Sequence, residues 1–146
     1  MKMLLLAAGV MREASEKNLL ENYTKRITRW PLTIEEEKSG QGDENWFLSR
    51  IPAHSYLILL DEKGDDISSM KQAKMITELE GMGEVKTLVW TIGGADGHKP
   101  AIRERADRVI RFGRQTWPHM LARIMLVEQL YRMQEIIRQS PYHREG

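Results

Sequence analysis

Apolar and polar residues follow one another along this chain in blocks that predict strands and helices in alternation. Near-continuous apolar runs predict buried strands at Met3–Ala8, His54–Leu60 and Thr87–Ile92. Shorter runs predict two more strands, at Leu32–Glu36 and Val109–Phe112. The segments between them predict helices at Glu13–Trp30, Glu44–Ile51, Ser68–Met82 and Pro100–Ala106. This order is typical of a single α/β domain, residues 1–146, with a mostly parallel sheet flanked by helices.

The last predicted helix, Pro118–Gln139, is apolar around most of its circumference. At helical spacing its apolar side chains form two stripes about 120° apart, and others lie on the opposite side: Leu121, Met125 and Ile136. One sheet can cover only part of such a helix. Two interpretations are open. The helix is either buried within its own domain, or packed between its own sheet and a second copy of the protein.

Three loops follow predicted interior or final strands directly. Ligands bind beyond the carboxyl ends of parallel strands, so these loops are expected to meet around one site: Asp61–Gly64, Gly93–His98 and Gly113–Thr116. Gly93-Gly94 lets the backbone turn sharply and approach a flat heterocycle or a phosphate. The loop lacks the Lys-Ser/Thr of a P-loop and the GxGxxG spacing. A plain tight turn is the alternative interpretation.

Composition excludes several classes of site. The chain has no cysteine, and its four histidines show no paired ligand spacing, so we expect no metal centre. No apolar run approaches the roughly 20 residues that span a membrane. The opening MKMLLLAAGV is interpreted as a buried strand rather than a signal peptide. A cytoplasmic protein without a membrane segment is therefore expected.

Charge is distributed unevenly, although the net charge is only +1. Residues 1–98 carry 12 Lys and Arg against 16 Asp and Glu, whereas residues 99–146 carry 10 against 5. All but one of the basic residues in the second part are arginines, which suit bidentate contact with phosphate or carboxylate. The excess favours an anionic partner at the C-terminal third of the chain. Solvated helix faces and internal ion pairs are the alternative.

The segment Pro141-Tyr142-His143-Arg144 places an aromatic ring, a titratable ring and a guanidinium directly after the long helix. Such a group can stack on a base and contact phosphate. A frayed terminus without a function is the alternative interpretation.

Six groups of residues occur in the order found in one known family: Leu60-Asp61 with Gly64; Ile92-Gly93-Gly94 with Gly97; Thr116 with Pro118-His119; Arg123; Glu128-Gln129-Leu130-Tyr131-Arg132; and Tyr142-His143-Arg144. Together they resemble the bacterial large-subunit rRNA pseudouridine N3-methyltransferases of the SPOUT superfamily, over nearly the whole chain. The resemblance implies a homodimer through the helix Pro118–Gln139 and an α/β fold with a C-terminal trefoil knot. Sequence patterns alone do not predict a knot, because threaded chains are rare.

The resemblance also implies site residues. S-adenosylmethionine (SAM) would be held, largely through backbone groups, by Leu60, Gly93, Gly94, Phe112, Gly113, Arg114, Gln115, Thr116 and Trp117. The RNA would be faced by Arg132, Tyr142, His143 and Arg144. His143 is the candidate base for the N3 proton, and Arg144 is the candidate cation that stabilises the imidate. Many members carry Leu-Ser where this chain has Phe112-Gly113, and the segment Ser39–Asn45 is shorter than usual.

The function implied is SAM-dependent methylation of N3 of a pseudouridine in large-subunit rRNA, on the assembled ribosome. SAM carries a methyl electrophile, so the protein has mainly to align it with the acceptor nitrogen. Two alternatives are kept. One is a non-catalytic RNA- or ribosome-binding module that needs no SAM, and the other is a SPOUT methyltransferase that acts on tRNA.

Overall fold

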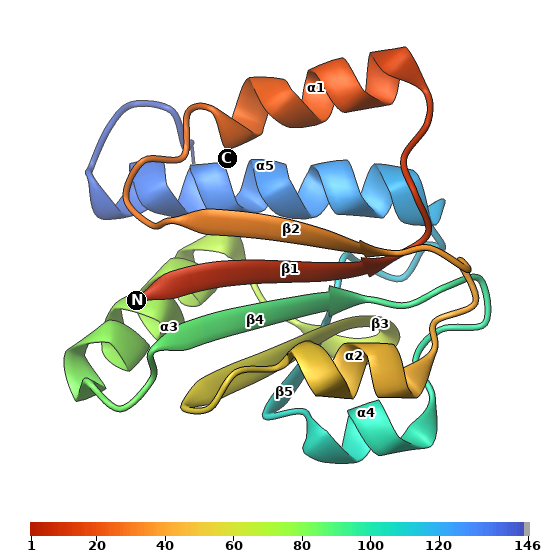
Figure 1. The fold of residues 1–146 in the computed structure, drawn as a ribbon. Helices are drawn as coiled ribbons and strands as arrows, with labels where there is room; N and C mark the ends of the chain where they lie inside the picture. The colour runs from red at the N-terminus through yellow and green to blue at the C-terminus, as the bar shows by residue number, and fades with distance from the viewer. Residues whose placement is uncertain (145–146) are drawn as a thin grey trace.

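Residues 1–144 are described by a computed structural model, in which five strands form one parallel sheet (Figure 1). The strand order is β2-β1-β4-β3-β5, and every neighbouring pair in it is parallel. The strands are β1 (Lys2–Ala8), β2 (Leu32–Glu37), β3 (Ser55–Asp66), β4 (Thr87–Ile92) and β5 (Arg108–Arg111). The helices are α1 (Ala14–Thr24), α2 (Glu44–Arg50), α3 (Ser69–Met82), α4 (Pro100–Arg105) and α5 (His119–Ile137). The α/β prediction is confirmed.

Helices cover both faces of the sheet (Figure 1). On one face, α1, α3 and α5 enclose the larger core, where Leu5 and Trp90 of the strands belong to the same cluster as Leu126 of α5. On the other face, the smaller core includes Phe47 of α2 and Ile102 of α4. Every residue of β4 is buried because this strand lies in the middle of the sheet. The apolar strand runs follow from this double cover.

The first helix is shorter than predicted. The pattern predicted Glu13–Trp30, but α1 ends at Thr24. The side chain of Gln134 on α5 accepts hydrogen bonds from the main-chain N–H groups of Thr28 (2.8 Å) and Arg29 (2.9 Å). Its amide nitrogen donates to a carbonyl of the same turn at 2.9 Å. These tertiary hydrogen bonds hold residues 25–31 in a turn and override the local helical pattern.

β3 continues beyond its predicted end at Leu60. The segment Asp61–Gly64, expected as a loop, is an irregular part of the strand, and both Leu60 and Asp65 pair with Ile110 of β5. Gly64 lies so close to β5 that a Cβ atom there would be 2.5 Å from the carbonyl carbon of Ile110. Only glycine fits this crossing of two backbones. The extension depends on a partner strand far along the chain, which the local pattern does not contain.

The remaining elements lie within one or two residues of the predictions. The Ser68 side chain accepts a hydrogen bond from the Lys71 N–H and caps α3, and Gly83 ends the helix with φ of +73°. Pro118 is the N-cap of α5 rather than its first helical residue.

The long helix α5 is covered by its own chain on most of its circumference. Leu126, Val127 and Leu130 are fully buried, whereas Leu121 is 43% exposed. Leu19 of the neighbouring α1 is exposed to the same extent. An apolar edge between α1 and α5 is therefore in contact with solvent in the single chain.

Candidate functional site

The carboxyl ends of β3, β4 and β5 border a cavity of about 690 Å³, together with the start of α5. Eight of the nine residues expected to hold SAM line it: Leu60, Gly93, Gly94, Phe112, Gly113, Gln115, Thr116 and Trp117. The ninth, Arg114, is not among the residues that line this cavity within the described range 1–144. The three strand ends therefore meet as the parallel topology requires.

The two glycines after β4 leave no room for a side chain. A Cβ atom on Gly93 would lie 2.7 Å from the carbonyl carbon of Gly97, and one on Gly94 would lie 2.5 Å from the carbonyl oxygen of Gly40. The Gly97 N–H donates to the Gly94 carbonyl at 2.9 Å and closes the turn. A larger residue at either position would therefore distort the protein's own backbone.

Glu37 holds the neighbouring loop that supports this glycine turn. Its buried carboxylate accepts hydrogen bonds from the main-chain N–H groups of Ser39 and Gly42, each at 3.1 Å, and from the Ser39 hydroxyl. Burial alone would raise the pKa of Glu37, but these hydrogen bonds outweigh it and lower the pKa. The short Ser39–Asn45 segment thus includes a fixed support for the cavity.

Asp61 and Arg103 form a polar part of the cavity wall that sequence reasoning missed. The nearly buried Asp61 carboxylate pairs with the Arg103 guanidinium. Arg103 Nε donates to the His98 carbonyl at 3.1 Å. These contacts tie the end of β3, the glycine turn and α4 together. The sequence signal for this ion pair was the opposite charge of Asp61 and Arg103, on two segments that the sheet topology brings to the same edge.

His98 packs behind the glycine turn. Its Nε2 lies 2.9 Å from Thr91 Oγ1, and its ring meets Phe47 edge-on. Burial lowers the pKa of His98, against the opposing effects of the hydrogen bond with Thr91 and the charge of Asp61. Burial therefore favours the neutral form of this ring.

The loop from β5 to α5 forms the third wall. Trp117 Nε1 donates to the Phe112 carbonyl at 2.8 Å and closes the loop. Gly113 has φ of +75°, and a Cβ atom there would meet nothing within 4 Å. The Phe112-Gly113 departure therefore leaves open space beside the main chain at Gly113.

Arg123 anchors the start of α5 beneath the cavity. Its guanidinium is fully buried and donates to the carbonyls of Ala8 (3.0 Å) and Gly9 (2.9 Å) at the end of β1. Its Nη1 also pairs with Glu36 at 2.6 Å. The helix that carries Ala122 into the cavity wall is thereby fixed to the central strands.

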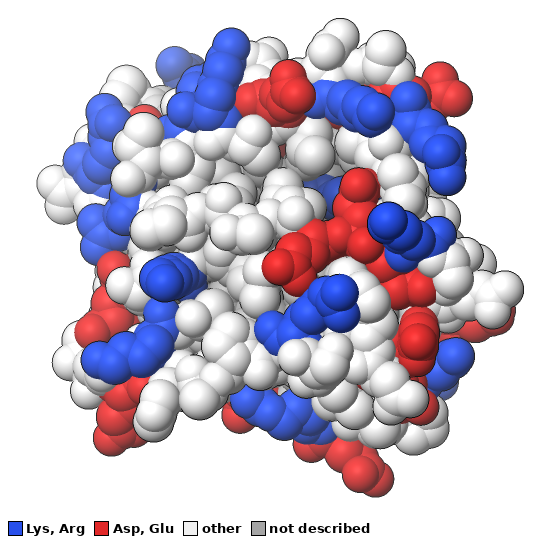
Figure 2. All heavy atoms as spheres, viewed as in Figure 1, with Lys and Arg blue, Asp and Glu red and all other residues white. Residues whose placement is uncertain are grey.

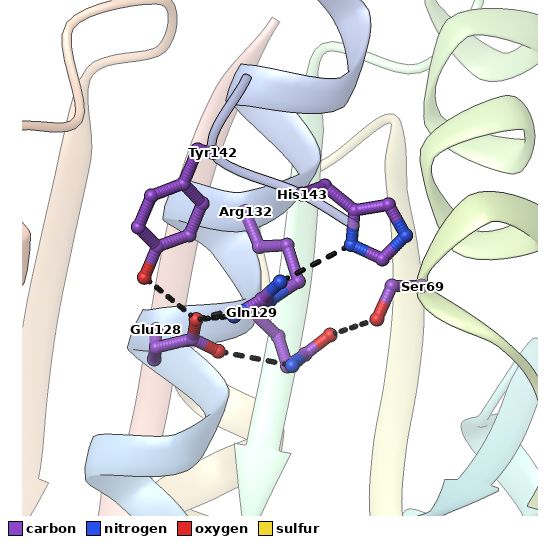
Figure 3. A network of polar contacts seen from close by, with 6 residues as sticks. All are labelled: Ser69, Glu128, Gln129, Arg132, Tyr142 and His143. Atoms are coloured by element: carbon purple, nitrogen blue, oxygen red, sulfur yellow. Dashed lines mark hydrogen bonds and ion pairs between the residues drawn. The ribbon is translucent and has the colours of Figure 1, made fainter. Parts of the chain in front are cut away.

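The residues expected to face RNA lie elsewhere. Among residues 1–144, the lining of the cavity does not include Arg132, Tyr142, His143 or Arg144. Figure 3 shows Tyr142 and His143 turned toward α5, where the Arg132 guanidinium is bound by Glu128 at 2.7 Å. The signal for this contact was the Glu-to-Arg spacing of four residues on one helix.

Most arginines of the C-terminal third form ion pairs within the chain. Within residues 1–144, six of the nine pair with a carboxylate: Arg103, Arg105, Arg111, Arg123, Arg132 and Arg138. Figure 2 shows one face of the molecule, where Lys and Arg lie both at the margin and nearer the centre, with Asp and Glu beside several of them and uncharged residues between. The alternative of internal ion pairs therefore accounts for most of the basic excess.

Neither a candidate metal site nor a membrane-crossing helix is found in the described part of the chain. Residues 1–144 contain no cluster of three or more His, Asp or Glu side chains that could hold a metal ion. Within the same range, no helix is both long enough and apolar enough to cross a membrane.

The chain is similar to known proteins over nearly its whole length. A family described as "Predicted SPOUT methyltransferase" matches residues 1–143. A "Ribosomal RNA large subunit methyltransferase H" from Sphingopyxis alaskensis is 43% identical over 145 residues, covering 97% of this chain and 96% of that protein. A protein of the same name from Paramagnetospirillum magneticum is 38% identical over 152 residues, covering 99% of each.

Two solved structures share the fold at low sequence identity. A probable methylase family protein from Haemophilus influenzae aligns with a TM-score of 0.59 and 7% identity, covering 98% of this chain and 70% of that one. The SpoU methyltransferase AviRb from Streptomyces viridochromogenes, in complex with the cofactor AdoMet, aligns with a TM-score of 0.50 and 11% identity. That alignment covers 91% of this chain and 58% of AviRb.

Proposed function

This chain belongs to the SPOUT methyltransferase family, and we propose that it transfers the methyl group of SAM to N3 of a pseudouridine in large-subunit rRNA. The observation that carries the proposal is the cavity at the carboxyl ends of β3, β4 and β5, in a chain that matches rRNA methyltransferases end to end. The rRNA substrate comes from the names of those relatives, and the pseudouridine N3 acceptor from the resemblance in the sequence.

The cavity fits SAM in size and in chemistry. Its volume of about 690 Å³ is within the range of pockets that bind small cofactors. Leu60, Ile92 and Phe112 offer apolar surface to a flat base, and the turns at Gly93–Gly97 and Gly113–Thr116 offer main-chain groups. When bound, SAM supplies an electrophilic methyl group. The protein's task is to orient it toward the acceptor nitrogen.

The second part of the proposal is a homodimer through α5. An apolar hollow of about 490 Å³ lies beside this helix, lined by Leu19, Tyr23, Phe112, Ile124, Met125, Glu128 and Gln129. The exposed side chains of Leu19 and Leu121 add to the apolar surface. A second copy packed on this surface would cover it. Leu121→Glu is expected to yield monomers, and sedimentation of the parent as a monomer at micromolar concentration would contradict the dimer.

The third part of the proposal is that the C-terminal tail, residues 142–144, acts across the dimer. Tyr142 and His143 contact side chains of α5 and are outside the lining of their own chain's cavity, as far as residues 1–144 are described. At an α5 interface they would border the partner's cavity instead. We infer that Tyr142, His143 and Arg144 face the pseudouridine that is methylated at that cavity.

Complementation tests action across the dimer. A chain truncated after residue 141 is mixed with a Gly93→Val chain, whose cavity loop is distorted by the clash at Gly97. Each homodimer is expected to be inactive. The heterodimer contains one complete site if the tail acts on the partner, so activity returns to about half the parent level from two-fold symmetry. No recovery in verified heterodimers would contradict this part.

The internal pairing of the arginines supports a structured ribosomal surface as the substrate rather than naked RNA. Binding of naked RNA depends on neutralising phosphates, and six arginines of the basic third are already paired.

We further propose a cytoplasmic location, where ribosomes are found. We also propose the C-terminal trefoil knot that the family resemblance implies, supported by the SPOUT family match over residues 1–143.

Calorimetry with SAM and a methyl-transfer assay test the function together. A parent that binds no SAM would support the non-catalytic RNA-binding alternative. A parent that binds SAM and methylates tRNA, but neither large subunits nor whole ribosomes, would support the tRNA alternative. Methyl transfer to ribosomes and not to purified rRNA is the expected result.

A further inference from the structure

The carboxylate of Glu128 is the centre of a polar network that joins α5 to the tail (Figure 3). Its Oε1 accepts hydrogen bonds from Arg132 Nε at 3.0 Å and from Arg132 Nη2 at 2.7 Å. The same oxygen accepts from the Tyr142 hydroxyl at 2.9 Å. The Gln129 amide donates to the other oxygen at 2.9 Å, and Gln129 in turn accepts from Ser69 of α3 at 2.6 Å. The carboxylate is thus anchored from two helices.

Tyr142 is fixed on this network in its protonated form. Its ring meets Tyr131 edge-on at 4.7 Å between centroids, and the Arg132 guanidinium lies 4.8 Å from its centroid. Burial and the hydrogen bond to Glu128 raise the pKa of Tyr142 to about 12. The hydroxyl therefore donates to Glu128 at neutral pH.

Arg132 also determines which nitrogen of His143 carries a proton. Arg132 Nη1 lies 3.1 Å from His143 Nδ1. A guanidinium has only donors, so Nδ1 must accept in this contact and cannot carry a proton. The ring proton is then on Nε2, which points away from Arg132 in Figure 3. The contact sets the tautomer of His143 through a residue that is itself held by Glu128.

We propose that Glu128 and Arg132 are positioning residues for the tail, and that through them His143 acts on the substrate as a hydrogen-bond donor from Nε2 rather than as a base. The proposal rests on the proposed function, because it concerns the tail residues assigned there to face the pseudouridine. It replaces the general-base role that the sequence suggested for His143. It also gives Arg132 an internal role in place of the expected contact with RNA.

The chemistry follows from a donor at this position. N3 of pseudouridine is an imide nitrogen between two carbonyl groups, and its proton passes to bulk water. The negative charge then spreads over N3 and the two carbonyl oxygens. The N–H of His143 and the guanidinium of Arg144 stabilise this imidate by donating to the oxygens. The N3 electron pair forms the bond to the methyl carbon as the carbon–sulfur bond of SAM breaks, with that electron pair remaining on sulfur.

The tautomer can be observed directly in the parent dimer. Long-range proton–nitrogen NMR of the imidazole ring, at mildly alkaline pH, is expected to show His143 with its proton on Nε2. The Arg132→Met variant is expected to show a mixture of tautomers, because the donor to Nδ1 is lost. A parent in which Nδ1 carries the proton, or an unchanged ring in Arg132→Met, would overturn the proposal.

Two substitutions of His143 distinguish a donor from a base. His143→Gln places an amide N–H near the former Nε2, whereas His143→Asn is too short to do so. For a donor, Gln is expected to keep methyl transfer to ribosomes within about tenfold of the parent, and Asn to lose about 10²-fold or more. For a base, both are expected to lose about 10²–10⁴-fold. Equal losses for Gln and Asn would contradict the donor role.

A double-mutant cycle tests whether Arg132 acts through His143. Arg132→Met is expected to lower kcat by about 10–100-fold because His143 loses the contact that orients its ring, with SAM affinity unchanged within about twofold. In the His143→Ala background the same change is expected to have almost no further effect. Independent, multiplying effects would overturn the positioning role. Arg138→Met is the matched control, since Arg138 is exposed and pairs only loosely with Glu135 at 3.6 Å.

The controls also separate this inference from the proposed function. A parent that transfers no methyl group to ribosomes would overturn the function and with it the inference. An active parent with an insensitive Arg132→Met variant would overturn the inference alone. Arg132→Lys provides a second variant, expected to restore part of the activity because an ammonium can still donate to Nδ1.

Discussion

The buried guanidinium of Arg123 is expected to be the largest single polar contribution to stability near the cavity. It is the donor to the carbonyls of Ala8 and Gly9, and Glu36 is its only partner of opposite charge within 4 Å among the described residues. Arg123→Met would leave two buried carbonyls without a donor, at about 1–3 kcal/mol each. Relief of the buried charge offsets part of this, because Arg123 Nε has no hydrogen-bond partner among residues 1–144. We expect a net loss of about 2–4 kcal/mol.

Removing the carboxylate instead tests the ion pair. The Glu36 side chain is 32% exposed, so Glu36→Gln is expected to cost less than the roughly 3–5 kcal/mol for breaking a fully buried pair, about 2–3 kcal/mol. A loss of about 3 kcal/mol corresponds to a fall in Tm of roughly 6–12 °C for a domain of this size. The double variant is expected to cost about 1–2 kcal/mol less than the sum of the two.

Urea denaturation of the parent, the two single variants and the double variant gives the four free energies of unfolding of this double-mutant cycle. Arg138→Met is the control: it removes an exposed guanidinium 3.6 Å from the buried Glu135 carboxylate, which keeps its hydrogen bond from the Gln134 amide, so we expect the free energy of unfolding to change by less than about 1 kcal/mol. An Arg123→Met variant as stable as the parent would refute the reasoning, since it would mean that the two carbonyls do not depend on the guanidinium.

Two further outcomes are expected. Gly94→Ala should lower the free energy of unfolding by about 1–3 kcal/mol, because its Cβ would meet the Gly40 carbonyl. In the control Gly81→Ala, in α3, the new Cβ meets no atom within 4 Å and should raise the free energy of unfolding by up to about 1 kcal/mol. Equal shifts of the calorimetric Tm in the two variants would contradict the clash. Burial lowers the pKa of His98 in the folded chain. Below about pH 6.5 the unfolded chain therefore binds a proton at His98 that the folded chain does not bind. The free energy of unfolding then falls as the pH drops, by up to about 1.4 kcal/mol per pH unit. Denaturation at several pH values should show a smaller slope in His98→Gln, and an identical slope would contradict this.

The sequence predicted the fold because its interior strands are buried on both faces. The runs at Met3–Ala8 and Thr87–Ile92 are apolar throughout, since helices cover both sides of β1 and β4. The end of α1 could not be predicted, because Gln134 binds the following turn from the far end of the chain. The extension of β3 depends in the same way on Ile110.

The candidate site was partly visible in the sequence. Gly93-Gly94 after a buried strand located the cavity, because the carboxyl ends of parallel strands meet. The Asp61–Arg103 contact could not be predicted, since it joins two segments that only the tertiary structure brings together. The Arg132–Glu128 ion pair could be anticipated from the spacing of four residues on one helix, and the expected contact of Arg132 with RNA stays a prediction.

The most direct test of the account is the identity of the methylated nucleoside. Ribosomes that lack the modification are incubated with the protein and SAM carrying an isotope-labelled methyl group, and the large-subunit rRNA is digested and analysed by mass spectrometry. The label is expected in N3-methylpseudouridine, and no label is expected with the chain truncated after residue 141. A label in any other nucleoside, or no label from a protein that binds SAM, would contradict it.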